Sequence, residues 1–335
     1  MSDPPAETLQ ALSAGRLLRD GLILLAAAIV VAGACSMVGV AELTVNVWRM
    51  RLLRLATASA VGSALAAAGM ALQALLRNPL AEPYVLGVSS GAGVGVLVGS
   101  VLAARGLLRI GWAGTPALAL AGAVGSCLVV YGVAQRRGRL DPYVLLLSGV
   151  IVNVFNGALM LAILLLSRSA DIINFVGWGM GQIGDATDAS LLWLCAAFIL
   201  AAWSVLFLRG AWFNALGLGD DVAGSAGVPV HWLRVETFAL AALMTAAAVA
   251  LAGPVGFVGL IVPHVCRMII GADHRRLVLF SGFVGAMFLM LADTLCRTVG
   301  EWVSVGSVPV GIITAISGGP FFIHLLRGRL KESSA

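Results

Sequence analysis

Long apolar runs separated by short polar segments dominate the 335-residue chain. After a first run from Gly21 to Ala41, charge-free runs fall at about residues 55–76, 84–104, 112–134, 142–167 and 189–208. A helix needs roughly 20 apolar residues to cross the hydrocarbon layer of a membrane. Each of these six runs therefore predicts one transmembrane helix.

The stretch 237–266 also lacks charge, but it is too long for a single span. It is interrupted at 253–256 by Gly-Pro-Val-Gly, where proline removes a backbone donor and glycine permits a turn. This pattern predicts a seventh helix ending near Ala252 and a short eighth helix reaching about Gly271. A ninth helix is expected at about 277–296 and a tenth from Pro309 to Leu326. The chain is thus predicted to be a single all-α transmembrane domain, residues 1–335, with about ten helices.

The composition excludes a soluble protein and argues against an enzyme. Hydrophobic residues make up 60% of the chain, charged residues only 11%, and the mean hydropathy is +1.01. A soluble domain carries about 25% charged residues. Lys331 is the single lysine, so the Gly-Lys-Ser/Thr sequence of a phosphate-binding P-loop does not occur. An HExxH motif does not occur either. If transport is driven by ATP, we expect a separate polypeptide to hydrolyse it.

The net charge of +5 comes from arginines that stand singly or in pairs between apolar runs. A nucleic-acid binder clusters such charges on one face, so no nucleic-acid partner is expected. With the N-terminus inside, the predicted outer segments hold seven of the 21 basic residues, which leaves 14 inside. Those seven are Arg49, Arg51, Arg54, Arg105, Arg109, Arg168 and Arg297. Because cytoplasmic loops carry an excess of Lys and Arg, both termini are predicted to be cytoplasmic, including the polar segment 1–20.

Cysteine and histidine form no ligand pattern along the chain. The five cysteines include no CxxC pair, and the four histidines are scattered. We therefore predict no metal site and no cofactor.

Two long polar connections interrupt the apolar runs. Residues 168–188 lie on the predicted outer side and are expected to hold a short helix around Ile172–Trp178. Residues 209–231 lie on the predicted cytoplasmic side. Long structured loops usually carry function, and a cytoplasmic loop is where a soluble partner can bind.

Several sequence segments occur in the order found in one transporter family. The strongest are 51–54 (RLLR), 73–83 (QALLRNPLAEP), 86–92 (LGVSSGA) and 252–264 (AGPVGFVGLIVPH), followed by 273–275, 292–293, 309–311 and 318–322. With these segments the chain resembles the FecCD permeases of binding-protein-dependent ABC importers, which include vitamin B12, haem and iron-siderophore permeases. The resemblance covers nearly all of the chain after about residue 45.

The resemblance implies the type II ABC importer permease architecture in a bacterial inner membrane. It further implies a homodimer with a central path, two ATP-hydrolysing subunits on the cytoplasmic side and an extracytoplasmic substrate-binding protein. The cargo is expected to be an iron-siderophore, haem or cobalamin-type compound, with an oxyanion left open. The main alternative is an ion-coupled secondary transporter, which the break at 253–256 and the lone Asp293 would suit.

The resemblance also assigns roles to three sets of residues. The docking set for acidic residues of the binding protein is Arg51, Arg54 and Arg297, although interfacial snorkelling is the simpler reading of each. The coupling loop to the ATPase includes Gly219, Asp220, Ala223 and Gly227. The simpler reading is that the acidic pair Asp220 and Asp221 only caps a helix N-terminus. The cytoplasmic gate includes Asn78 and Leu80, in what could also be only a rigid turn.

Two positions depart from the family pattern, and one acidic residue has an open role. Ala226 precedes the second glycine of the coupling loop, where leucine is frequent, and no proline precedes Arg54 in the predicted first outer loop. Asp293 lies four residues before Arg297, a spacing that favours a local ion pair over a proton relay.

Overall fold

The structure is a computed structural model that describes residues 6–39, 44–107, 114–136, 139–184, 188–303 and 308–332. Parts of five predicted features lie outside the described residues. These parts are residues 1–5 of the polar N-terminal segment, residues 40–41 of the first apolar run, Arg109, residues 112–113 of the fourth apolar run and residues 185–187 of the predicted outer loop.

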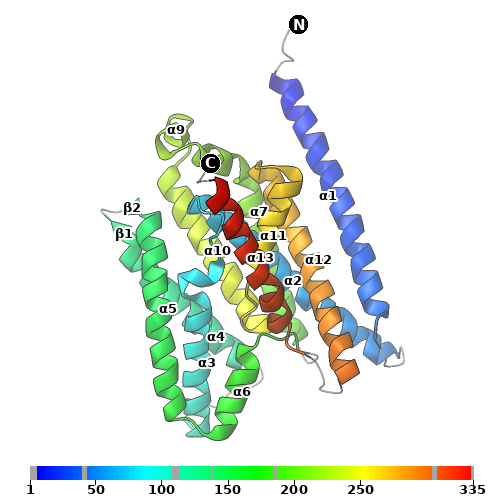
Figure 1. Ribbon diagram of the computed structural model, residues 1–335, viewed down its shortest axis with the longest axis vertical. Helices are drawn as coiled ribbons and strands as arrows, with labels where there is room; N and C mark the ends of the chain where they lie inside the picture. The colour runs from blue at the N-terminus through cyan, green and yellow to red at the C-terminus, as the bar shows by residue number, and fades with distance from the viewer. Residues whose placement is uncertain are drawn as a thin grey trace.

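The described residues form ten apolar helices besides the short connecting ones, which confirms the predicted all-α class and roughly fits the predicted helix number (Figure 1). Seven are long and apolar enough to cross a membrane, and three are shorter apolar helices. They are α1 (Ala6–Met37), α2 (Val45–Leu75), α3 (Val88–Ala104), α4 (Gly114–Ala134), α5 (Pro142–Leu165), α7 (Ala189–Leu208), α10 (Val230–Ala252), α11 (Val258–Ile270), α12 (His274–Val303) and α13 (Val310–Glu332).

Short elements connect these helices. They are η1 (Pro83–Leu86), α6 (Ser169–Gly179), α8 (Gly210–Gly217), α9 (Asp220–Ser225) and an antiparallel hairpin of β1 (Gln135–Arg136) and β2 (Arg139–Leu140). The hairpin follows α4 and was not expected from the sequence. Helix α6 covers the region where the sequence predicts a short helix.

Helix α2 begins about ten residues earlier than the apolar pattern predicts. Thr44 caps its N-terminus by accepting a hydrogen bond from the backbone N–H of Val47 (3.4 Å). Arg51 and Arg54 therefore lie on the helix and not in an outer loop, which corrects the sequence-based assignment. The apolar criterion started the helix too late because it treats charged residues as loop residues, whereas these two side chains have polar partners inside the bundle.

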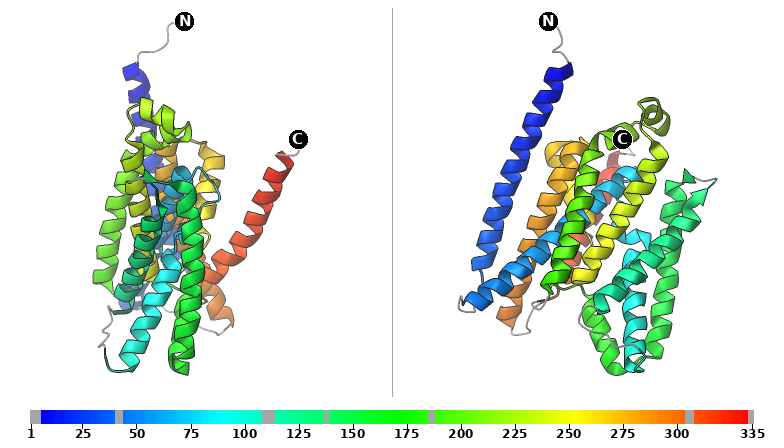
Figure 2. Two further views of the ribbon diagram at one scale, coloured as in Figure 1. Left: turned by 90° about the vertical axis from the view of Figure 1, so that its left-hand side faces the viewer. Right: turned by 180° about the vertical axis from the view of Figure 1, so that it is seen from behind.

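Helix α2 is the central helix of the bundle, and small residues let its neighbours approach closely (Figure 2). Gly62 faces the backbone of Gly285 on α12, and Gly69 faces the backbone of Gly259 on α11. A side chain at either glycine would overlap these backbone atoms. Lipid provides no hydrophobic drive between helices, so close contact between small residues supplies much of the packing energy.

The predicted break between the seventh and eighth helices is present between α10 and α11. Phe257 adopts a left-handed backbone conformation with a φ of +67°. Its N–H donates to the Glu82 carboxylate (2.5 Å), and the N–H of Val255 donates to the Tyr84 hydroxyl (2.7 Å). Segment 82–84 thus satisfies backbone groups that the break leaves without helical partners, as irregular backbone inside a membrane requires.

The two ends of the bundle differ (Figure 1). One end holds α9, the first turns of α1 and the last turns of α13, and we refer to it as the α9 end. Helix α6 lies at the opposite end, the α6 end. The candidate functional residues fall at both ends.

Candidate functional site

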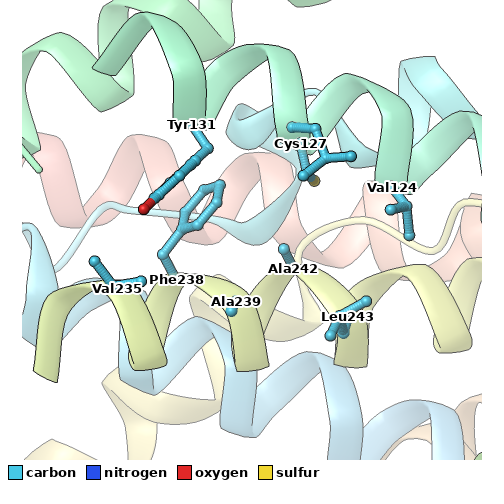
Figure 3. A pocket seen from close by; sticks show the side chains of 9 residues that line it. Val124, Cys127, Tyr131, Val235, Phe238, Ala239, Ala242 and Leu243 are labelled. Atoms are coloured by element: carbon cyan, nitrogen blue, oxygen red, sulfur yellow. The ribbon is translucent and has the colours of Figure 1, made fainter. Parts of the chain in front are cut away.

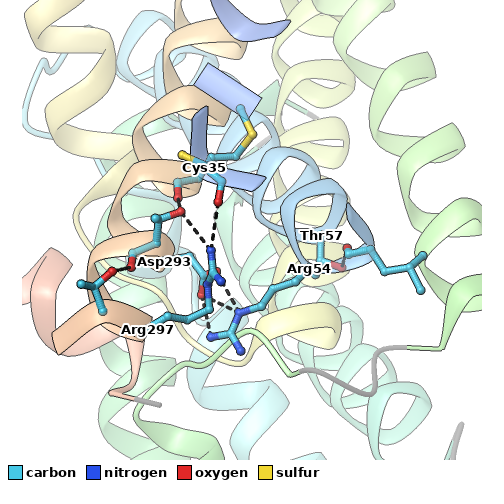
Figure 4. A network of polar contacts seen from close by, with 9 residues as sticks. Cys35, Arg54, Thr57, Asp293 and Arg297 are labelled. Atoms are coloured by element: carbon cyan, nitrogen blue, oxygen red, sulfur yellow. Dashed lines mark hydrogen bonds and ion pairs between the residues drawn. The ribbon is translucent and has the colours of Figure 1, made fainter. Parts of the chain in front are cut away.

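A buried ion pair joins α2 to α12 near the α6 end (Figure 4). The Arg54 guanidinium binds the Asp293 carboxylate in a bidentate manner, with Nε–Oδ2 at 2.8 Å and an Nη2–Oδ1 hydrogen bond at 2.9 Å. The two side chains are only 4% and 1% exposed. Such paired bonds are among the strongest polar contacts in proteins, so they fix the two helices relative to each other.

Two further arginines extend this cluster to α1. Arg51 donates to the backbone carbonyl of Ser36 (3.1 Å), and Arg297 donates to that of Cys35 (3.3 Å). Both carbonyls belong to the last turn of α1. The three arginines of the predicted docking set are therefore brought together, and they join α1, α2 and α12.

Asp293 has more partners than its sequence spacing indicates. The expected contact with Arg297 is present at 3.7 Å, but the closer contacts come from Arg54, 239 positions away. A carboxylate held by two guanidinium groups is not available to bind a transported cation. The ion-coupled alternative therefore loses the acidic residue on which it depended.

The burial of this cluster bears on the predicted docking role. Arg51 and Arg54 are 7% and 4% exposed, so their charged groups contact this chain in the conformation described. Docking of a binding protein on these arginines therefore stays a prediction.

At the α9 end, two short helices form the loop for which the sequence predicts coupling. Gly219 (φ +128°) separates α8 from α9, and Gly227 (φ +81°) follows α9. Ala223, a residue of α9, is fully buried. Asp220 begins α9, and its carboxylate forms ion pairs with Arg77 and with Arg234, the latter at 2.8 Å. The acid thus links the loop to two other parts of the chain, which the simple capping interpretation does not account for.

Side-chain contacts also hold α8 in place. Arg209 binds Glu236 of α10 through two hydrogen bonds (2.8 and 3.1 Å). Asn214 donates to Asp273 (2.8 Å) and accepts from the N–H of His274 (2.8 Å), at the start of α12. The loop is therefore a structured element fastened to α10 and α12.

This loop nevertheless exposes apolar side chains. Leu218 is 74% exposed and Val222 is 48% exposed. Leu218 directly follows α8, and Val222 is on α9. Exposed apolar side chains on such a loop are typical of a protein-binding surface.

The predicted gate residues lie in a tight turn between α2 and η1. Asn78 accepts a hydrogen bond from the N–H of Leu80 on its side chain (3.0 Å), and its own N–H donates to the carbonyl of Gln73 (3.1 Å). We call residues 77–81 the gate turn. Arg77, the first residue of the turn, contacts the coupling loop.

A cavity of about 570 Å³ follows the gate turn along the chain. Its wall combines polar side chains with the stacked rings of Phe175 and Trp178, whose centroids are 5.9 Å apart. The lining includes Glu82, Tyr84, Ser89, Ser90, Asn153 and Pro254, from η1, α3, α5 and the break before α11. An open cavity with a few placed polar groups is typical of a ligand path.

A smaller groove of about 280 Å³ separates α4 from α10 (Figure 3). Tyr131 and Phe238 stack across it, with ring centroids 5.9 Å apart. The remaining lining is Val124, Cys127, Leu128, Val235, Ala239, Ala242 and Leu243. Leu128 is 64% exposed, so the groove opens to the outer surface of the bundle. Its apolar walls suit hydrocarbon and lack the polar groups that would orient a cargo.

Ten apolar helices, an open cavity with a few polar side chains in its wall and a structured loop at one end define a multi-pass membrane permease. The FecCD transport family matches residues 22–328, so the chain belongs to this family of ABC importer permeases. The resemblance noted in the sequence is thereby confirmed.

Individual relatives agree with this assignment. The chain is 36% identical over 292 residues to the hemin transport system permease protein HmuU of Yersinia pestis, with 86% of this chain and 85% of the relative covered. It is 39% identical over 281 residues to the vitamin B12 import system permease protein BtuC of Escherichia coli O157:H7, covering 84% and 83%. A solved inward-facing metal-chelate type ABC transporter superposes with a TM-score of 0.80 at 28% identity, covering 93% and 99%.

Proposed function

We propose that the chain forms half of a homodimeric importer that works with two ATPase subunits and an extracytoplasmic binding protein. The α9 end and both termini face the cytoplasm, and the α6 end faces the outside of a bacterial inner membrane. The cargo is an iron-siderophore, haem or cobalamin-type compound, as the names of the relatives suggest. The chain itself catalyses no covalent step, and ATP hydrolysis belongs to the separate subunits.

The observation that carries this proposal is the structured loop of α8 and α9. It exposes Leu218 and Val222 to the solvent at one end of the bundle, while Ala223 of the same loop is buried. Contacts to α10 and α12 connect the loop to the membrane helices. An ATPase bound to this surface can therefore change the packing of the bundle by moving one element.

The open cavity supports a path shared between two copies. Its described walls come from η1, α3, α5, α6 and the break, and one side is open. A second copy of the chain would close that side, with the gate turn of each copy below the cavity. Asn78 and Leu80 are then placed where they can close the cytoplasmic end.

The arginine cluster is proposed to lie under the surface to which the binding protein docks and to attract its acidic residues. Arg297 is 13% exposed, more than Arg54. Positive charge at the α6 end favours acidic residues on a docking protein and guides their encounter. We expect Arg297→Ala to weaken stimulation of ATPase activity by the binding protein, and stimulation equal to that of the unmodified complex would contradict this role.

Assembly can be tested by co-expressing the chain with its ATPase subunit. Charged residues on the exposed apolar surface, as in Leu218→Asp with Val222→Asp, are expected to abolish co-purification of the ATPase. The matched control is Leu107→Asp with Val303→Asp, at two exposed apolar side chains after α3 and at the end of α12, and the ATPase should still co-purify with this variant. Retention of the ATPase by the loop variant would refute the proposed docking surface.

Cargo class can be tested with the binding protein encoded beside this chain. Quenching of its fluorescence by haem, cobalamin, a ferric siderophore and molybdate would be measured at equal concentrations. We expect tight binding of one of the first three. Binding of molybdate alone would replace the proposed cargo class with an oxyanion while leaving the importer assignment intact.

A further inference from the structure

The arginine that follows α2 has a backbone conformation that favours glycine. Arg77 has a φ of +48°, in the left-handed region. Its N–H donates to the carbonyl of Ala74 (3.4 Å), and the next N–H donates to that of Gln73 (3.1 Å). These two bonds form the helix-ending motif that usually has glycine at this position. A side chain raises the energy of this conformation, so the presence of arginine requires a role for its side chain.

That side chain reaches from the gate turn to the coupling loop. Its Nε donates to the backbone carbonyl of Leu216 in α8 (3.0 Å), and its Nη2 forms an ion pair with Asp220, the first residue of α9. Arg234 of α10 holds the same carboxylate from another direction at 2.8 Å. Both helices of the coupling loop are therefore bonded to the residue that begins the gate turn.

We propose that Arg77 is the positioning residue through which movement of the coupling loop moves the gate turn. The inference rests on the proposed function, because it requires an ATPase to move α8 and α9. It adds a residue that links the loop to the turn.

The environment of the contact suits a bond that changes during a transport cycle. The Arg77 and Asp220 side chains are 39% and 43% exposed. Water can replace either partner at this exposure, so the pair contributes little to stability and can break and re-form. A buried pair could not do so without a large energetic cost.

The far end of the same segment is fixed. Glu82 and Tyr84 bind the backbone N–H groups of Phe257 and Val255 at the break before α11. If the coupling loop moves Arg77, the backbone can therefore shift only at the few residues between Arg77 and Glu82. Those residues include Asn78 and Leu80.

Arg77→Gly is the decisive variant, because the backbone already has the conformation that glycine prefers. The assembled complex with its ATPase and binding protein would be placed in proteoliposomes, and cargo transported per ATP hydrolysed would be measured. We expect this ratio to fall at least tenfold while the ATPase still co-purifies. Arg139→Gln, an exposed arginine in β2, is the control and should leave the ratio unchanged.

A double-mutant cycle tests whether Arg77 acts through Asp220. Asp220→Asn should reduce the ratio, and combining it with Arg77→Gly should reduce it no further, because both changes remove one link. If the double variant instead lost the product of the two single-variant fold-reductions in this ratio, Arg77 would not act through Asp220. A ratio for Arg77→Gly equal to that of the unmodified complex would overturn the proposal itself.

The gate can also be observed directly by crosslinking Leu80→Cys between the two copies. We expect ATP to change the crosslinking yield in the otherwise unmodified complex and to leave it constant when Arg77→Gly is added. An ATP-dependent change that persists with Arg77→Gly would refute the inference. If the unmodified complex showed no ATP-driven uptake, the proposed function would fail, and the inference would fail with it.

Discussion

The two ends of α2 carry the same chemical pair, a guanidinium beside a carboxylate, in opposite environments. Toward the α6 end, Arg54 binds Asp293, and the side chains are 4% and 1% exposed. At the α9 end, just after the last residue of α2, Arg77 binds Asp220, and the two side chains are 39% and 43% exposed. The same charges therefore have different consequences at the two ends.

Burial decides how easily each pair can be broken. Removing one partner of a buried pair leaves a desolvated charge and typically costs about 3–5 kcal/mol. An exposed pair contributes about 0–1 kcal/mol, because water solvates the separated charges. We infer that α2 is fixed at its α6 end and free to respond at its α9 end.

The largest expected effect comes from Asp293→Ala, which leaves the buried Arg54 without its carboxylate. The free energy of unfolding should fall by about 3–5 kcal/mol. Unfolding in detergent can be followed by the fluorescence of the eight tryptophans. Asp221→Ala, at an exposed acid on α9, is the control and should change the value by less than about 0.5 kcal/mol. Equal stabilities for the two variants would contradict the difference between the ends.

The next effect is expected midway along α2, at Gly69→Val. The new side chain would overlap the backbone of Gly259, which cannot rotate away. We expect the free energy of unfolding to fall by about 3 kcal/mol, in the upper part of the range for overpacking. Gly132→Val on α4 introduces the same side chain where no atom lies within 4 Å, and this variant should fold normally. A stable Gly69→Val protein would mean that α2 is not tightly held between the two ends.

A smaller effect is expected for Arg297→Ala. Asp293 keeps its bidentate contact with Arg54, and Arg297→Ala removes the longer contact at 3.7 Å and the hydrogen bonds to Cys35 and Thr294. We expect a loss of about 1.5 kcal/mol, at the low end for hydrogen bonds to charged groups. Arg105→Ala, at an exposed arginine, provides the comparison in the same unfolding assay. A loss as large as that of Asp293→Ala would show that Arg297 and not Arg54 is the main partner.

The smallest effect on stability is expected for Arg77→Gly. Relief of the left-handed conformation gains about 1–2 kcal/mol. The added chain entropy of glycine costs about 0.5–1 kcal/mol, and the lost exposed pair costs about 0–1 kcal/mol. These contributions nearly cancel, so the free energy of unfolding should change by less than about 1 kcal/mol. A large loss of stability in the same unfolding assay would place Arg77 with the structural contacts of the α6 end.

Much of the fold could be predicted from the sequence because lipid imposes a simple rule on each segment. The apolar runs predict the helices, and the Gly-Pro-Val-Gly sequence at 253–256 predicts the break between α10 and α11. Helix ends were less predictable. Arg51 and Arg54 belong to α2 only because tertiary partners accept their charges.

Contacts between distant residues could not be predicted in the same way. The four-residue spacing of Asp293 and Arg297 suggests a local pair, whereas Arg54 is 239 positions from its partner. The left-handed backbone of Arg77 has no signal in the sequence, since glycine is the residue expected there. Its contact with Asp220 spans 143 positions. The sequence therefore indicates the loop and the gate but not the residue that joins them.

The proposed function requires that this permease take its driving force from ATP hydrolysed by another subunit. Cargo uptake would be measured in proteoliposomes with and without the ATPase subunit, ATP and an imposed ion gradient. We expect uphill uptake only with the ATPase and ATP, unchanged when ionophores collapse the gradient. Uphill uptake by the permease alone, driven by the gradient and indifferent to ATP, would contradict the account.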